Sequence, residues 1–156
     1  MKFEFNDGGR QAAGYKGTTG DCVCRSIAII TGKSYQEIYD ALNQLSKDMG
    51  KWHVYNLVQT EYGNSYQKAS SARTGVQRKI YDKYLKSLGY EWIATMGIGT
   101  GCQIHLKPDE LPAGRLIVRV SKHLTAVIDG IINDTWDCSR EETRCVYGYY
   151  YKPTQK

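Results

Sequence analysis

The chain has 156 residues, of which 41% are hydrophobic, and this length and composition suit one domain with one continuous core. Its aromatic content of 12%, with 13 tyrosines, excludes a disordered chain, and its net charge of +5 favours contact with a polyanion. Its apolar runs are far shorter than the roughly 20 residues that span a bilayer, and the first residues lack an apolar secretory stretch, so we expect a cytoplasmic protein without membrane contact.

Glycines dominate the first part of the chain. Their spacing in residues 6–20 is incompatible with a regular helix and predicts an ordered loop. The mostly apolar residues 23–31 that follow predict a buried helix. Asp21 is a good amino-terminal cap for this helix, and Gly32 is placed to end it in the left-handed conformation.

A second helix is predicted to follow directly. Ser34 and Glu37 have the spacing of a capping box, and apolar side chains recur at helical intervals as far as about Asp48. Residues 50–71 are instead rich in Gly, Asn, Ser and Tyr. We therefore expect a long loop or excursion in that segment.

A third helix is predicted between Thr74, which can cap it, and Gly89, which can end it. Its apolar positions are spaced by three and four, and its opposite face is basic. The cations that we expect to contact substrate or nucleic acid are Arg78, Lys79 and Lys83. The tyrosines interleaved around residues 66–86 suggest an alternative function, in which the chain is a nucleic-acid or protein-binding module without catalysis.

Strand-like runs follow the third helix, at residues 90–95, 115–120, 124–128, 131–134 and 146–151. The Asp129-Gly130 pair between two of these runs is a signal for a two-residue hairpin. Helices followed by strands predict an α+β fold, with amino-terminal helices packed on a carboxy-terminal antiparallel sheet. We expect a single domain over residues 1–156.

Cysteine provides the first candidate for chemistry. The five cysteines are an odd number, so at least one thiol is free, and without an export signal reduced thiols are expected. Cys22 lies at the first turn of the predicted buried helix, where backbone N–H groups and the helix dipole stabilise a thiolate and a developing oxyanion. Cys22 is therefore the candidate nucleophile, with a buried structural thiol as the alternative.

A base for this thiol must come from one of three histidines. His53 falls in the predicted excursion and His105 at the edge of a turn, whereas His123 opens a predicted strand. Asp134 ends the neighbouring strand across the hairpin and can accept a hydrogen bond from the imidazole. Other acids that remain alternatives for this orienting role are Asp129 and Asp137.

Three segments carry a family resemblance: Gly-Asp-Cys-Val-Cys-Arg-Ser-Ile-Ala at 20–28, His-Leu-Thr-Ala-Val-Ile-Asp-Gly at 123–130, and Asp-Thr-Trp at 134–136. They resemble the nucleophile helix, the histidine strand and the orienting segment of papain-like cysteine peptidases, including bacteriocin-processing ones. The whole chain also resembles small phage and bacterial proteins. The resemblance implies a papain-like fold and a Cys22, His123 and Asp134 triad. It also implies a peptide or protein substrate, hydrolysed at a peptide or isopeptide bond through a thioester.

The chain departs from this family at the second oxyanion donor. Papain-like enzymes usually place a glutamine about six residues before the cysteine, where this chain has Lys16. Gln11 is our candidate for the missing donor, with Thr18 and Thr19 as alternatives.

The predicted site needs no metal and no organic cofactor. A zinc site is the alternative that the cysteines and histidines raise, but the only close pair of cysteines, Cys22 and Cys24, has one residue between its members, whereas structural zinc sites usually draw on pairs with about two to four residues between them. His123 and Thr125 also match one His-x-Thr element of two-histidine phosphoesterases, which need a second copy that the sequence lacks.

Overall fold

The computed structural model describes residues 1–16, 20–59, 71–73 and 75–153, without side chains for 50–59. Within these residues the fold is α+β, with three helices and one six-stranded mixed sheet. The elements in chain order are β1 (Lys2–Phe5), α1 (Cys22–Thr31), α2 (Tyr35–Gln59), α3 (Arg78–Ser87), β2 (Glu91–Ala94), β3 (Arg115–Val120), β4 (His123–Ile128), β5 (Ile131–Asp134) and β6 (Gly148–Tyr151). No helix in the described part is long and apolar enough to cross a membrane.

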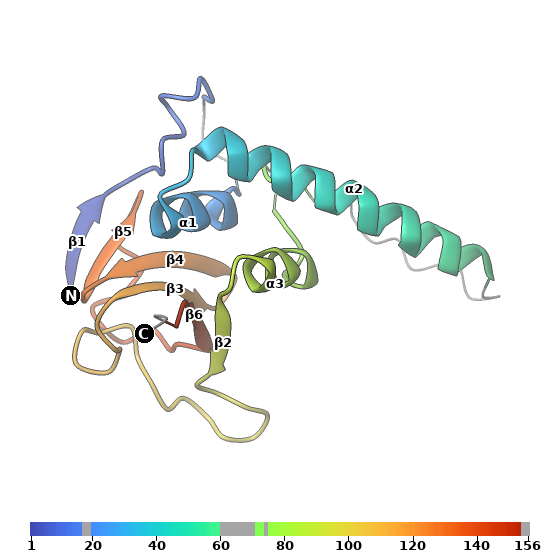
Figure 1. Cartoon of the computed structure of the whole chain (residues 1–156). Helices are drawn as coiled ribbons and strands as arrows, with labels where there is room; N and C mark the ends of the chain where they lie inside the picture. The colour runs from blue at the N-terminus through green and yellow to red at the C-terminus, as the bar shows by residue number, and fades with distance from the viewer. Residues whose placement is uncertain (17–19, 60–70, 74, 154–156) are drawn as a thin grey trace.

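The sheet has the strand order β1-β5-β4-β3-β6-β2. The helices lie on one of its faces, with α1 over the middle of the sheet and α2 extending away from it (Figure 1). A core cluster on this face joins α1 to alternate residues of the strands, such as Ile117, Leu124 and Ala126. A second cluster contains the intervening residues, such as Val118 and Val127, so the sheet is buried on both faces.

The central strands form where the sequence predicts them. The predicted turn is present, since Asp129 and Gly130 both have positive φ (48° and 78°), as a type I′ hairpin turn requires. This turn pairs β4 with β5 in antiparallel register, with Ala126 opposite Asn133. The hairpin therefore places the start of β4 next to the end of β5, at the same end of the two strands.

The carboxy-terminal strands pair in antiparallel fashion as predicted, but the sheet also contains an amino-terminal strand, β1, that we did not predict. This strand pairs with β5 in parallel, with Phe5 aligned to Asp134, so the sheet is mixed. All four residues of β1 are exposed, because it is an edge strand with one neighbour. Its formation depends on a partner about 130 residues away in sequence, which no local turn signal could indicate.

The predicted end of the second helix is also wrong. The backbone of α2 continues past Asp48 to Gln59, through the first part of the segment that we expected to be a loop. The segment contains no proline, and a single Gly50 inside a helix costs only about 1 kcal/mol. The rest of the expected loop, residues 60–70, lies outside the described residues, as does the predicted cap Thr74.

Not all cysteines are reduced thiols. Cys102 and Cys145 form a disulfide across 43 residues of sequence. Cys22, Cys24 and Cys138 are free, in agreement with the prediction that at least one thiol is unpaired. Only these three thiols are therefore available for chemistry.

Close packing between β2 and β6 gives a test of the fold. A Cβ atom at Gly148 would lie 2.3 Å from the ring of Trp92 and 2.6 Å from the carbonyl oxygen of Ile93. We expect Gly148→Ala to destabilise the protein by about 2 kcal/mol and to lower its Tm by about 5 °C, as measured by circular dichroism. In the control Gly97→Ala, the new Cβ meets Thr100 at an ordinary 3.6 Å, so equal melting temperatures for both variants would contradict this packing.

Candidate active site

The candidate nucleophile lies at the start of α1. Cys22 is the first residue of this helix and is half-buried against the helix-side core. Burial opposes ionisation of its thiol. The hydrogen bond and positive charge of His123, the backbone N–H of Leu124 and the charge of Arg25 outweigh that effect and lower the pKa of Cys22.

His123 and Asp134 are brought together by the β4–β5 hairpin. The Nε2 atom of the imidazole lies 2.7 Å from Oδ2 of Asp134, and both side chains are more than nine-tenths buried. With Nε2 engaged by the carboxylate, Nδ1 is the ring nitrogen that remains for the thiol. The ring of Trp136 lies beside the imidazole, 5.3 Å between centroids, and partly covers the site.

The carboxylate of Asp134 is held by several donors. The hydroxyl of Thr125 donates to Oδ2 at 2.8 Å, the N–H of Thr135 donates to Oδ1 at 2.7 Å, and Arg25 approaches Oδ1 at 3.4 Å. Burial would raise the pKa of Asp134, but its hydrogen bonds and the charge of His123 lower the pKa below its ordinary value. The carboxylate is therefore ionised at neutral pH and fixed in orientation.

The histidine is correspondingly stabilised in its protonated form. Burial would lower its pKa, but hydrogen bonds with Asp134, Cys138 and Cys22 and the charge of Cys22 raise the pKa of His123 to about 11. The lowered pKa of the thiol and the raised pKa of the imidazole both favour a thiolate and imidazolium pair. Such a pair is the reactive form of an activated cysteine.

Arg25 is a member of the site that our sequence reasoning missed. Its guanidinium pairs with Asp21 in the turn before α1 and also reaches Asp134. Asp21 precedes the helix as predicted, but its side chain makes no capping bond and accepts instead from Arg25, Arg10 and Tyr35. The signal available in the sequence was an arginine within an otherwise apolar helix, because a buried charge needs a partner.

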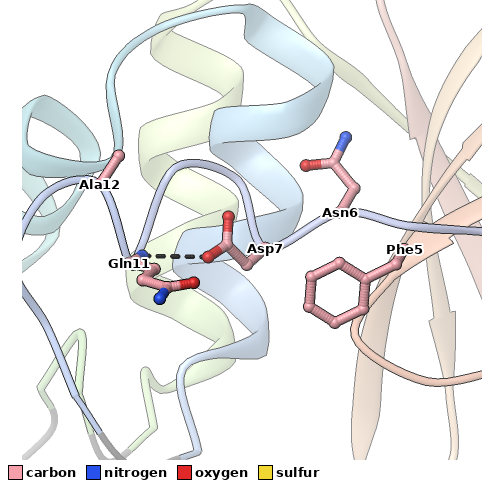
Figure 2. A pocket seen from close by; sticks show the side chains of 5 residues that line it. All are labelled: Phe5, Asn6, Asp7, Gln11 and Ala12. Atoms are coloured by element: carbon pink, nitrogen blue, oxygen red, sulfur yellow. Dashed lines mark hydrogen bonds between the residues drawn. The ribbon is translucent and has the colours of Figure 1, made fainter.

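The side chain that we expected to donate to the oxyanion lies in the loop between β1 and α1. Gln11 is exposed and lines an open hollow with Phe5, Asn6, Asp7 and Ala12. Figure 2 shows this hollow, with the backbone N–H of Gln11 donating to Asp7 at 3.0 Å. The backbone N–H of Gln11 is thus bonded to Asp7, and the alternatives Thr18 and Thr19 lie outside the described residues.

The basic residues of α3 are arranged differently from one another. Lys79 and Lys83 are exposed, whereas Arg78 lies over the ring of Trp92 at 5.0 Å. Tyr81, which we expected among the stacking tyrosines, is buried against Tyr150. The surface of α3 therefore offers cations, but Tyr81 is not available there to stack on a base.

One group of side chains has the composition of a metal site. His123, Asp134 and Cys138 offer ligand atoms within 4.8 Å of one another. The nitrogen and oxygen of the first two already share a hydrogen bond, so an ion there would have to replace it. The cysteine-rich zinc site considered from the sequence is wrong for Cys102 and Cys145, which are joined to each other.

Comparisons with protein-family models, with curated proteins and with solved structures found no match. The functional argument therefore depends on the geometry around Cys22.

Proposed function

We propose that the protein is a cysteine hydrolase that uses Cys22 as nucleophile, His123 as proton carrier and Asp134 as the residue that orients the imidazole. The observation that carries this proposal is the position of His123, which interacts with the thiol of Cys22 and is bonded to Asp134 at 2.7 Å. Cys22, His123 and Asp134 belong to three different elements, α1, β4 and β5, which contribute to one arrangement around the thiol. A structural thiol needs no such arrangement.

The chemistry follows from the position of each group. The thiolate of Cys22 attacks a carbonyl carbon and forms a C–S bond, and His123 gives its proton to the leaving amine as the C–N bond breaks. His123 then takes a proton from water, and the hydroxide formed attacks the thioester and releases the acid. Charge on the carbonyl oxygen is stabilised by N–H groups of the first turn of α1, which precede the first helical hydrogen bond, from Arg25 N–H to Asp21.

We propose a peptide or isopeptide bond in a protein or peptide substrate, and a papain-like arrangement of helix and sheet. The support is the family resemblance of the segments around Cys22, His123 and Asp134, together with an α+β fold that has the nucleophile at a helix start. No residue of this mechanism requires a metal or an organic cofactor.

Alkylation with iodoacetamide tests the proposal. At about pH 6 an ordinary cysteine, with a pKa near 8.5, is almost entirely protonated and reacts slowly. Because the pKa of Cys22 is lowered, we expect labelling there at least about tenfold faster than that of an unperturbed thiol. The rate should fall only as the pH drops through the lowered pKa of Cys22, and should stay level through neutral pH, where the raised pKa of His123 keeps the imidazolium beside the thiolate.

His123→Ala should remove the fast reaction and move the pH profile of Cys22 to higher pH. Intact mass and peptide mapping will show which thiol reacts. Cys24 is an internal reference, because burial raises its pKa to about 12 and keeps it neutral. Fast labelling that persists in His123→Ala, or that falls on Cys138, would disprove the proposed pair.

A further inference from the structure

Arg119 lies on β3, which pairs with β4, the strand that begins with His123. It lies directly opposite Leu124, the residue after His123. Side chains of opposite residues point to the same face of a sheet, with Cβ atoms about 5 Å apart, and Leu124 belongs to the helix-side core. The hydroxyl of Ser26 on α1 donates to the carbonyl oxygen of Leu124 at 3.0 Å, so the start of α1 crosses β4 at this point. Arg119 therefore lies one strand away from Leu124, whose backbone N–H interacts with Cys22, and on the side of β4 away from Asp134.

Arg119 and a second arginine, Arg78, each lie against an aromatic ring. The guanidinium of Arg119 lies 5.6 Å from the ring of Tyr147, and Arg78 lies over Trp92 at 5.0 Å. Trp92 reaches this place because its ring covers Gly148, the residue that pairs with Arg119 across the sheet. The two arginines come from β3 and α3 and converge on the same part of the helix-side face.

Tyr81 provides independent support for their proximity to the nucleophile. Burial raises the pKa of this tyrosine, the charges of Arg119 and Arg78 oppose that rise, and the charge of Cys22 adds to it. One phenol thus experiences both arginines and the nucleophilic sulfur. Tyr81 is therefore within electrostatic range of each of the other three side chains.

Neither arginine has a carboxylate partner among the described residues. The ion pairs among the described residues include Arg10 and Arg25, but none of them includes Arg78 or Arg119. The acid nearest in sequence to Arg78 is Asp82, whose carboxylate is bound by Lys86 and by the hydroxyl of Tyr150. Arg119 is half-buried, whereas Arg78 is exposed and its charge also acts on Asp82. A half-buried guanidinium without an ion pair, such as that of Arg119, can bind an external acid.

We propose that Arg119, assisted by Arg78, binds a carboxylate of the peptide substrate next to the bond that Cys22 attacks. This inference rests on the proposed function and assigns it a substrate class, peptides with an acidic residue beside the scissile bond. Trp92 and Tyr147 keep the two guanidinium groups at that place, and the imidazolium of His123 adds to the positive potential. The carboxylate replaces the missing internal acid.

The ratio of two alkylation rates tests this assignment. Iodoacetate and iodoacetamide both lose iodide to the Cys22 thiolate, but only iodoacetate carries a carboxylate. We expect Arg119→Gln to lower the iodoacetate to iodoacetamide rate ratio about fivefold, Arg119→Lys to retain most of it, and Arg78→Gln to lower it less. Added salt should lower the ratio in the wild type, because it screens the charges. Lys2→Gln on β1, at the opposite edge of the sheet, removes the same charge and should leave the ratio unchanged.

The outcomes separate this inference from the proposed function. A ratio that is equal in the wild type, Arg119→Gln and Arg78→Gln would overturn the carboxylate site, even where iodoacetamide still labels Cys22 in a His123-dependent way. Loss of that His123 dependence would overturn the proposed function itself. Protection of Cys22 by a short oligonucleotide, but not by a glutamate-containing peptide, would assign the arginines to phosphate and also overturn the carboxylate assignment. Arg78 is exposed on α3, so Arg78→Gln remains informative if Arg119→Gln does not fold.

Discussion

Replacing Cys22 with alanine is expected to abolish the burst of p-nitrophenol that p-nitrophenyl acetate releases from the wild-type protein. This activated ester acylates a reactive thiolate, so the burst measures formation of the thioester and the later steady rate measures its hydrolysis. His123→Ala should lower the acylation rate at about pH 6 by about a hundredfold, because a thiol with a pKa near 8.5 is then mostly protonated. The double variant should be no slower than Cys22→Ala, since both residues act in one step.

Cys24→Ala is the matched control for this experiment. Cys24 is a buried thiol two residues further along α1, and burial raises its pKa to about 12. Its removal should leave both burst and steady rate unchanged. A burst that persists in Cys22→Ala would contradict the assignment of the nucleophile. A burst without a steady rate would show a thioester that water does not clear, and would favour acyl transfer over hydrolysis.

The sequence predicted the parts of the site that depend on local signals. Gly32 ends α1 with a φ of 75°, as expected for a left-handed cap, which fixes the end of the helix that begins with Cys22. The Asp129-Gly130 turn fixes the register that places the end of β5 beside the start of β4. The proximity of His123 and Asp134 follows from that turn alone, which explains why it could be predicted from a single sequence.

Long-range features could not be predicted in the same way. The parallel pairing of β1 with β5 and the disulfide between Cys102 and Cys145 join segments that no turn connects. The alternation of Phe3 and Phe5 in β1 was a strand signal, but it indicates no partner. The basic face of α3 was visible in the sequence, whereas Arg119 occurs in an apolar strand and had no motif to mark it.

Arg25 is the missed residue with the largest expected effect on stability. Its side chain is 8% exposed and joins Asp21, which precedes α1, to Asp134, at the end of β5. Removing one partner of a buried ion pair leaves the other charges without compensation and costs about 3 kcal/mol. We therefore expect Arg25→Ala to lower the Tm by about 10 °C in a chain of this size, as measured by circular dichroism.

The charge of Arg25 also helps to lower the pKa of Cys22, so the same variant should change reactivity in a defined direction. With that charge removed, the thiol pKa rises, and the iodoacetamide profile of Arg25→Ala should move to higher pH at a temperature where the variant is folded. Arg25→Lys should restore much of the profile, because it retains the charge. The control Lys33→Ala removes an exposed pair with Glu37 and should change stability by less than about 0.5 kcal/mol. If Arg25→Ala is destabilised but its pH profile is unshifted, Arg25 has a structural role only. A shifted profile identifies it as a positioning residue, which couples the folding of α1 to the ionisation of Cys22, the first side chain of that helix.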